Sequence, residues 1–340
     1  MSSNNAKVTV VVVPRERFSV ARRSLESLIA NSPSGLNLIY MDGGSPPALR
    51  RYLEKAATEH HFRLLRYDCY LSPNEARNIG FAEVTTPYVV FVDNDIIFAP
   101  GWLENLMNCA QQTGAWLVGP LYCEGNPPHE IIHMAGGDAF LEENSEGRWL
   151  YEVHRYVGEP LAHVRHRLRR EPTQVIEFHA MLVQSDALRR LGPLDERLMC
   201  TREHLDFCIR VARAGGKIYI EPHAVVTNLQ PPPVAWSDLS FYLLRWSDEW
   251  THSTYRRLAE TWGSHDGYDV DLRRRIRTYR RQGLPILRAF ASVFGESAAK
   301  WFDDILDSAL TAAARRRRRR VLAGRPALAP PSPVQPSSAF

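Results

Sequence analysis

Short apolar runs alternate with amphipathic stretches along the first 230 residues of the chain. The runs at 7–13 (KVTVVVV), 36–44 (LNLIYMDGG) and 88–92 (YVVFV) are rich in β-branched residues and are typical of strands buried on both faces of a sheet. Between them, residues 19–32 and 46–60 carry apolar side chains at helical spacing. This alternation predicts an α/β fold with a mainly parallel, Rossmann-like sheet flanked by helices.

The pattern changes after three consecutive prolines at 231–233, which predict a boundary. Residues 237–262 and roughly 270–312 are expected to form helices with many aromatic side chains. From Arg315 onward a run of arginines gives way to Pro, Ser and Ala, a composition typical of disorder. The predicted organisation is a domain at 1–230, a helical C-terminal region at 231–313 and a disordered basic tail at 314–340.

The formal charge of +4 conceals an acidic body. Seven arginines and no acids follow residue 314, so residues 1–314 carry 35 basic and 38 acidic side chains, a net charge of −3. That balance argues against a specific nucleic-acid surface. The arginine run itself suits peripheral contact with anionic lipid at the inner face of a membrane, or non-specific nucleic-acid binding, but a solvated tail is the favoured interpretation.

Cysteine usage and hydropathy indicate the compartment. The five cysteines form an odd set without a C-x-x-C pair, which fits free thiols in a reducing compartment and predicts no zinc site. The apolar run at the N-terminus is too short for a signal peptide, and no stretch approaches the roughly 20 apolar residues of a membrane span. We therefore expect a cytoplasmic protein.

Two acids interrupt an apolar segment at Asp93-Asn94-Asp95. In an extended chain, residues two apart point the same way, so Asp93 and Asp95 would offer convergent oxygens to Mg²⁺ or Mn²⁺. The alternative, favoured on these three residues alone, is that one acid caps the next helix and the other is solvated.

Further polar residues follow the predicted strands and helix starts. Asp42, after the second strand, can accept from a ribose hydroxyl or a base N–H, or can form a local turn. Arg77 and Asn78 lie on a predicted helix, where an arginine beside two carboxylates can hold a diphosphate and where a solvated face is the alternative.

A later helix, REHLDFCIRV, begins with Glu203 and His204. Acids in a first helical turn are favoured by the macrodipole alone. The functional alternative is a general base, for which imidazole is suited near neutral pH. Glu177 and His179, on one face of a predicted strand, are candidates for contacts with an acceptor or a donor sugar.

In order along the chain, Asp42, the ARN of residues 76–78, the DND of residues 93–95, GPLDE at 192–196 and the acid-led helix resemble glycosyltransferase family 2 with the GT-A fold, over roughly residues 7–230. The resemblance implies an inverting transfer of a sugar from a nucleotide-sugar donor, a UDP-sugar first among them, to a hydroxyl of a glycan, lipid-linked or small-molecule acceptor. It also implies a divalent metal, Mn²⁺ or Mg²⁺.

The resemblance assigns roles on the donor side. Asp42 matches the nucleoside-binding acid, and Arg77 with Asn78 matches the family's donor-side ARN. The DND segment matches the family's D-x-D, with Asp93, Asn94 and Asp95 at the donor and Asp95 as the direct metal ligand. Pro14, Arg15 and Glu16 replace the family's usual sequence at the end of the first strand and would line the donor pocket.

Two positions depart from the family pattern. Asn228 occupies the place of a histidine that often contacts the metal, so Asp93, Asp95 and Asn228 form the expected ligand set. His204 stands where the family has its catalytic aspartate, so either His204 or Glu203 supplies the base. The alternatives are a nucleotidyltransferase, although VVVPRERFS lacks the glycine of a phosphate loop, and a non-catalytic family member.

Overall fold

The computed structural model describes residues 7–15, 17–145, 147–229, 234–264, 278, 280 and 284–324. The strands are β1 (Val8–Val13), β2 (Asn37–Gly43), β3 (Arg63–Tyr67), β4 (Tyr88–Asp93), β5 (Ile96–Phe98), β6 (Leu117–Glu124), β7 (Ile131–Met134), β8 (Gly137–Asn144), β9 (Gly147–His154), β10 (Glu171–Pro172), β11 (Ala180–Gln184) and β12 (Ile218–Asn228). The helices are α1 (Phe18–Ala30), α2 (Pro47–Glu59), α3 (Pro73–Phe81), α4 (Trp102–Thr113), α5 (Leu161–Val164), α6 (Ser185–Leu191), α7 (Glu203–Arg213), α8 (Leu239–Arg245), α9 (Asp248–Trp262), α11 (Pro285–Phe294) and α12 (Glu296–Val321).

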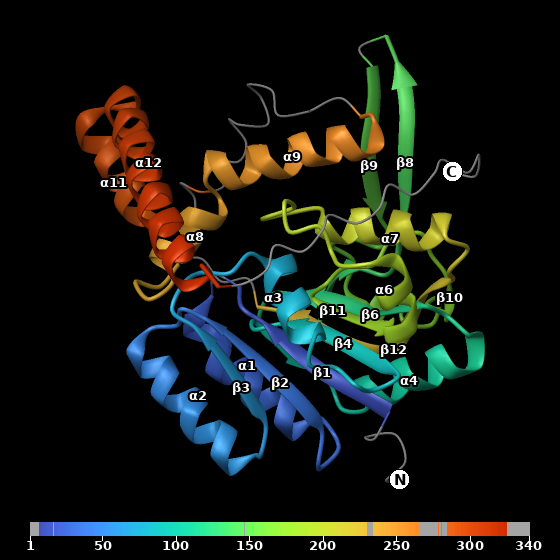
Figure 1. Cartoon of the computed structure of the whole chain (residues 1–340). Coiled ribbons are helices and arrows are strands. Elements are labelled where there is room, and N and C mark those ends of the chain that lie inside the picture. The colour runs from blue at the N-terminus through green and yellow to red at the C-terminus, as the bar shows by residue number, and fades with distance from the viewer. Residues whose placement is uncertain are drawn as a thin grey trace.

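Ten strands of the described chain form one sheet, with the order β10-β12-β6-β11-β4-β1-β2-β3, and β5 pairs with β12 while β7 pairs with β6. The strands β3, β2, β1 and β4 are mutually parallel, and β6 is parallel to β12. Between these two parallel groups β11 runs antiparallel to both neighbours. Helices pack against the sheet, as Figure 1 shows, so the predicted α/β architecture is confirmed.

The predicted strands and helices form for local reasons that the sequence displays. All six side chains of β1 are buried, as expected for a β-branched strand inside a sheet. Helix α3 begins with a capping box between Ser72 and Glu75 and has Pro73 in its first turn. A Cβ at Gly80 would lie 2.5 Å from the Val11 side chain, so α3 lies against β1 at a distance that only glycine allows.

The antiparallel strand β11 positions the cavity described below. Ala180 pairs with Val92, so the residues just before β11 lie beside the carboxyl end of β4. There the Asp93 amide donates to the carbonyl of His179. Because β11 is antiparallel to β4, its first residues lie beside the carboxyl end of β4, and β1 ends next to β4. Polar residues from the start of β11 and from the ends of β1 and β4 therefore gather on the same side of the sheet.

The C-terminal helices extend away from the sheet, where α11 and α12 lie side by side, and the β8–β9 hairpin also projects from it (Figure 1). In α9, Trp262 donates to Asp206 of α7 and ties this region to the sheet domain. The predicted boundary at 231–233 lies outside the described residues. None of the helices that the structure describes has both the length and the apolarity to cross a bilayer.

The expectation of disorder from residue 314 is wrong for the arginine run, because α12 continues through it to Val321. Alanine and arginine have high helix propensity. Arg315 forms an ion pair with Glu249, and Arg318 lies 3.1 Å from the buried carboxylate of Glu75. These contacts offset the repulsion between neighbouring arginines. The rest of the predicted tail, 325–340, lies outside the described residues.

Candidate active site

A cavity of about 180 Å³ opens at the strand ends and is lined mainly by charged side chains. Its charged and histidine lining consists of Arg15, Arg17, Arg202, Arg245, Asp93, Asp95, Glu177, Glu203, His133, His179 and His204. Phe178, Thr201, Asn228 and Trp246 complete it. The four arginines are matched by four acids in this lining, and their guanidinium groups are of the type that binds phosphate oxygens.

Two arginines join the two predicted halves of the site. Arg15 places Nε 3.3 Å from Asp93 Oδ2 and donates from Nη1 to Glu203 Oε1 at 3.1 Å. Arg77 contacts the same two acids: its Nη2 lies 3.4 Å from Asp93 Oδ1, and its Nη1 lies 3.4 Å from Glu203 Oε1. The guanidinium of Arg77 also lies 3.8 Å from the centre of the Phe178 ring. The side chain of Arg77 is fully buried, so it holds Asp93 and Glu203 in position beneath the cavity.

This ion-pair network fixes the charge states of its acids. Burial raises the pKa of Glu203, but Arg15 and Arg77 outweigh that effect and bring the pKa to about 2. The pKa of Asp93 is also well below its usual range, because Arg15, His179 and Arg77 outweigh its burial. Burial lowers the pKa of Arg77 to about 10, which leaves it protonated at neutral pH. Glu203 is therefore a weak base.

Asp93 and Asp95 do not lie in one extended strand, contrary to the expectation from their spacing. Strand β4 ends at Asp93, and Asn94 and Asp95 form a turn before β5. The turn is fixed by Asn94, whose side chain accepts from the Arg15 amide at 2.9 Å. As a result, Asp93 faces Arg15, Arg77 and His179, whereas Asp95 faces Arg17 at 3.8 Å. Both acids still line the same cavity.

The structure brings Asn228 next to Asp95. Asn228 ends β12 opposite Ile96, and the Leu229 amide donates to the carbonyl of Asp95 at 3.0 Å. The side-chain oxygen of Asn228 is buried and accepts no hydrogen bond within the described chain. An oxygen of this kind, beside a carboxylate, can serve as a ligand for a hard cation.

His204 is held by an acid that the sequence analysis did not select. Its Nε2 lies 2.8 Å from Oε2 of Glu152, which comes from β9, and the same carboxylate oxygen is 3.6 Å from Nε2 of His154. Burial lowers the pKa of His204, but the Glu152 carboxylate, with smaller effects of Glu177 and Glu203, raises it to about 9. Because a carboxylate only accepts, Nε2 carries the hydrogen and Nδ1 is the ring atom that can take a further proton.

The predicted donor-side residues Pro14, Asp42 and Asn78 do not line the cavity. Asp42 is buried at the end of β2, where it accepts from the Ser45 amide and hydroxyl and pairs with Arg66. Asn78 exchanges hydrogen bonds with the backbone of Leu194 and so holds the GPLDE segment. Pro14 is buried at the end of β1, and Glu16 lies outside the described residues.

Several residues in the cavity or beside it were not predicted from the sequence. Arg17 could have been selected, since it follows Arg15 by two positions in the same loop. His133 and Glu152 lie in the Gly-, His- and Arg-rich stretch between residues 124 and 173, where no periodic pattern marks the strands. Arg245 and Trp246 end α8, beyond the predicted boundary, and nothing in their spacing points back to the sheet.

Comparison with known proteins agrees with this architecture. The family model described as "Glycosyl transferase family 2" matches residues 9–168, which include most of β1, the Asp93–Asp95 turn and His133. The match to glycosyltransferase family 2 thus spans a little under half of the chain. The segments that complete the cavity, with Glu177, Glu203 and Asn228, lie beyond the matched range.

Two curated relatives align with parts of the chain. The chain is 30% identical over 224 residues to the pre-mycofactocin glycosyltransferase of Mycobacterium tuberculosis, an alignment that covers 65% of this chain and 42% of the relative. It is 27% identical over 122 residues to the succinoglycan biosynthesis protein ExoM of Rhizobium meliloti, covering 35% of this chain and 40% of ExoM. The chain thus spans less than half the length of these relatives.

A solved structure shares the fold of the family 2 domain. The crystal structure of GalNAc-T7 with UDP, GalNAc and Mn²⁺ aligns with a TM-score of 0.54 and 19% identity, over 83% of this chain and 55% of that one. At that identity the likeness concerns the GT-A fold alone.

Proposed function

We propose that this protein is an inverting glycosyltransferase that moves a sugar from a nucleotide-sugar donor, a UDP-sugar first among the candidates, to an acceptor hydroxyl. The observation that carries the proposal is the cavity itself, where four arginines and His204, which is held by Glu152, meet at the strand ends of a chain that resembles family 2. Cations suit the diphosphate of a donor, and a buried imidazole suits the deprotonation of an acceptor.

On the donor side, Arg15, Arg17, Arg202 and Arg245 would bind the diphosphate. Arg77 and Asn94 would act as positioning residues, because one holds Asp93 from beneath and the other fixes the loop that carries Arg15. Asp42, with its carboxylate anchored by Ser45 and Arg66, would meet the nucleoside at the end of β2.

A divalent Mn²⁺ or Mg²⁺ fits the oxygens of Asp95 and Asn228, which are neighbours across the β5–β12 pairing. The buried, unbonded side-chain oxygen of Asn228 supports this assignment. When bound, such an ion would neutralise charge that develops on the leaving diphosphate.

On the acceptor side, His204 is the proposed base and Glu152 its positioning residue. The acceptor oxygen forms the new bond to the anomeric carbon as its proton passes to Nδ1 of the unprotonated imidazole, and the nucleoside diphosphate leaves with the electrons of the broken C–O bond. Glu203 is the weaker choice because Arg15 and Arg77 both engage its Oε1.

The test is donor binding and hydrolysis by the purified chain against a panel of UDP-, GDP- and dTDP-sugars, with and without Mn²⁺ or Mg²⁺. We expect one donor to bind with metal dependence and Asp95→Ala to abolish that dependence. Donor binding that responds to neither metal nor Asp95→Ala would contradict the metal assignment. The matched variant Asp186→Ala, on the exposed surface of α6, should behave like wild type.

Peripheral membrane contact through the arginine run stays a prediction. Arg315 and Arg318 are used inside the chain, so contact with anionic lipid would fall to the other arginines of the run. Co-sedimentation with vesicles of anionic or neutral lipid checks it, with retention only on the anionic vesicles expected.

A further inference from the structure

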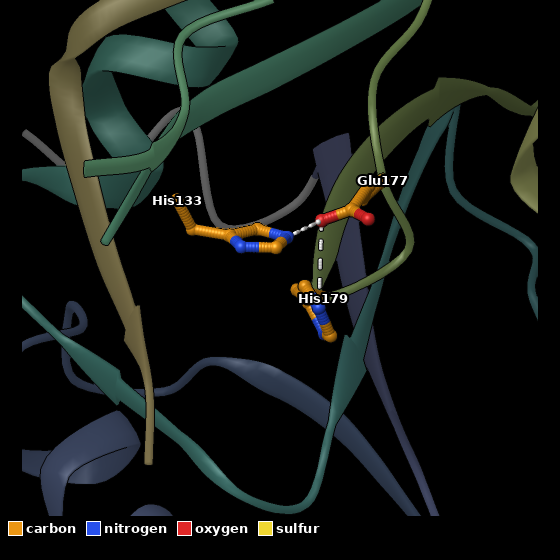
Figure 2. Close-up of side chains that lie close together, drawn as sticks. All are labelled: His133, Glu177 and His179. Atoms are coloured by element: carbon orange, nitrogen blue, oxygen red, sulfur yellow. Dashed lines mark ion pairs between the residues drawn. The ribbon is translucent and has the colours of Figure 1, made fainter. Parts of the chain in front are cut away.

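His133, Glu177 and His179 form a compact cluster at the side of the cavity (Figure 2). His133 comes from β7, and the other two residues immediately precede β11. Oε2 of Glu177 lies 2.9 Å from Nε2 of His133 and 3.4 Å from Nε2 of His179. One ligand atom from each of the three residues lies within 4.8 Å of the others.

These separations match the edges of a metal coordination sphere. Zinc ligands lie at about 2.0–2.2 Å from the ion, so two ligands at a tetrahedral angle are about 3.3 Å apart. The two contacts of the Glu177 oxygen, at 2.9 and 3.4 Å, bracket that value. The two imidazole nitrogens lie within 4.8 Å of each other, so a small movement would let the three atoms share one ion.

Each imidazole of the cluster has a second carboxylate on its far side. Nδ1 of His133 is 3.3 Å from Oε2 of Glu124, and Nδ1 of His179 is 3.0 Å from Oδ2 of Asp93. A carboxylate accepts the Nδ1 hydrogen, and this leaves the Nε2 lone pair directed at Glu177. A histidine that donates one ring hydrogen to a carboxylate and offers its other nitrogen to an ion is the usual arrangement in protein metal sites.

Two of the three inner atoms lie close together without good hydrogen-bond geometry. Nε2 of His133 and Oε2 of Glu177 are buried and form an ion pair at 2.9 Å that lacks good hydrogen-bond geometry, whereas Nε2 of His179 also lies 3.4 Å from Nδ2 of Asn228. The neighbouring Glu152–His204 pair differs, because its 2.8 Å contact has hydrogen-bond geometry. The geometry of the His133–Glu177 pair would also suit two ligands of one cation.

We propose that His133, Glu177 and His179 bind a divalent transition-metal ion of the zinc type, with a remaining coordination position open to an oxygen of a ligand in the cavity. Two imidazole nitrogens and one carboxylate oxygen prefer Zn²⁺ or Co²⁺ to Mg²⁺, unlike the oxygen donors of Asp95 and Asn228. The cysteine count gave no sign of this site because none of its ligands is a cysteine. The inference concerns metal binding and does not depend on the proposed sugar transfer.

The test uses the full chain, freed of metal with a chelator and then titrated with Co²⁺ or Zn²⁺. We expect the wild type to retain an equivalent of Co²⁺ through dialysis, to show the visible absorption of a low-symmetry Co²⁺ centre, and to unfold at a higher temperature with Zn²⁺. Glu177→Gln and His133→Gln should lose this equivalent. Glu124→Gln, which removes only an outer carboxylate, should weaken binding by about 10–100-fold.

Two controls make the result specific. His223 and Glu221 form a similar pair at 2.9 Å, with an exposed imidazole outside the cavity, so His223→Gln should bind Co²⁺ like wild type. Asp95→Asn should also keep the Co²⁺ equivalent. Far-ultraviolet circular dichroism of each metal-free variant checks that it is folded.

A wild-type chain that retains no Co²⁺ or Zn²⁺, or a folded Glu177→Gln variant that binds as the wild type does, would overturn the inference. Co²⁺ binding without turnover of any donor and acceptor would leave it standing and count against the proposed function. Donor turnover in a chain that binds no Co²⁺ would support the proposed function and overturn the inference of a metal site.

Discussion

Replacing Glu152 with glutamine should move the pH dependence of sugar transfer. Glu152 is the main cause of the raised His204 pKa of about 9. Glutamine keeps the size of the side chain but removes the charge, so the opposing effect of burial should return the His204 pKa to near its ordinary value of about 6.5. The carboxylates of Glu177 and Glu203, which also raise this pKa, remain in place. A change of about 2.5 pH units corresponds to about 3 kcal/mol.

The magnitude follows from the unprotonated fraction of His204. With a pKa of about 9, about 1 in 100 imidazoles is unprotonated at pH 7, and about half are unprotonated at pH 9. With a pKa of about 6.5, about three quarters are unprotonated at pH 7, and nearly all are unprotonated at pH 9. The ratio of wild-type to Glu152→Gln rates should therefore fall by about 40-fold between pH 9 and pH 7. At high pH the variant should be slower, because its base is weaker and less well oriented.

The assay is kcat/KM for transfer from saturating donor, measured across this pH range for both proteins. Glu143→Gln, an exposed acid on the same hairpin, is the matched control and should leave the profile unchanged. An acid limb at the same pH in wild type and in Glu152→Gln would refute the assignment of His204 as the base.

Two further predictions concern stability. Arg77→Met removes the fully buried partner of Asp93 and Glu203 and should lower the free energy of unfolding, measured by urea denaturation, by about 3–5 kcal/mol. The control Arg50→Met, at an exposed ion pair on a helix, should change the free energy of unfolding by less than about 0.5 kcal/mol. Equal effects of the two substitutions would contradict the role of Arg77. The folded-state pKa of His204, about 9, exceeds its unfolded value of about 6.5, so its stabilising contribution is complete below about pH 6.5 and is lost as the pH rises to about 9. The unfolding temperature should fall across this window, and by less in His204→Gln.

Much of the sheet domain could be predicted because its signals are local. The β-branched run of β1, the Ser72–Glu75 capping box and the glycine that lets α3 approach β1 are each visible within a few residues of sequence. The acids at 93 and 95 were also visible, because two carboxylates inside an apolar run are unusual. The turn that separates them was not, since it depends on the hydrogen bond from Arg15 to Asn94.

The rest of the cavity depends on contacts between distant segments. Arg15 and Glu203 are 188 positions apart, and Glu152 meets His204 across 52 positions. Sequence periodicity does not reveal such pairings, because the presence of each polar residue alone is accounted for by its place in a loop or at the start of a helix. The helical arginine run was missed for a related reason: Glu249 and Glu75, which pair with it, lie in other helices.

The sequence separation of Arg15 and Glu203 also determines when each of them becomes available during synthesis of the chain. At a synthesis rate of roughly 5–20 residues per second, the 188 positions between them take about 10 to 40 s to appear. Strand β1 can pair with β4 during that interval, which supplies Asp93 as a partner for both arginines. Until α7 is synthesised, Arg15 and Arg77 share the single carboxylate of Asp93, so solvent and small anions must balance the second positive charge. The two arginines are matched by two carboxylates only after Glu203 has been synthesised and α7 has packed.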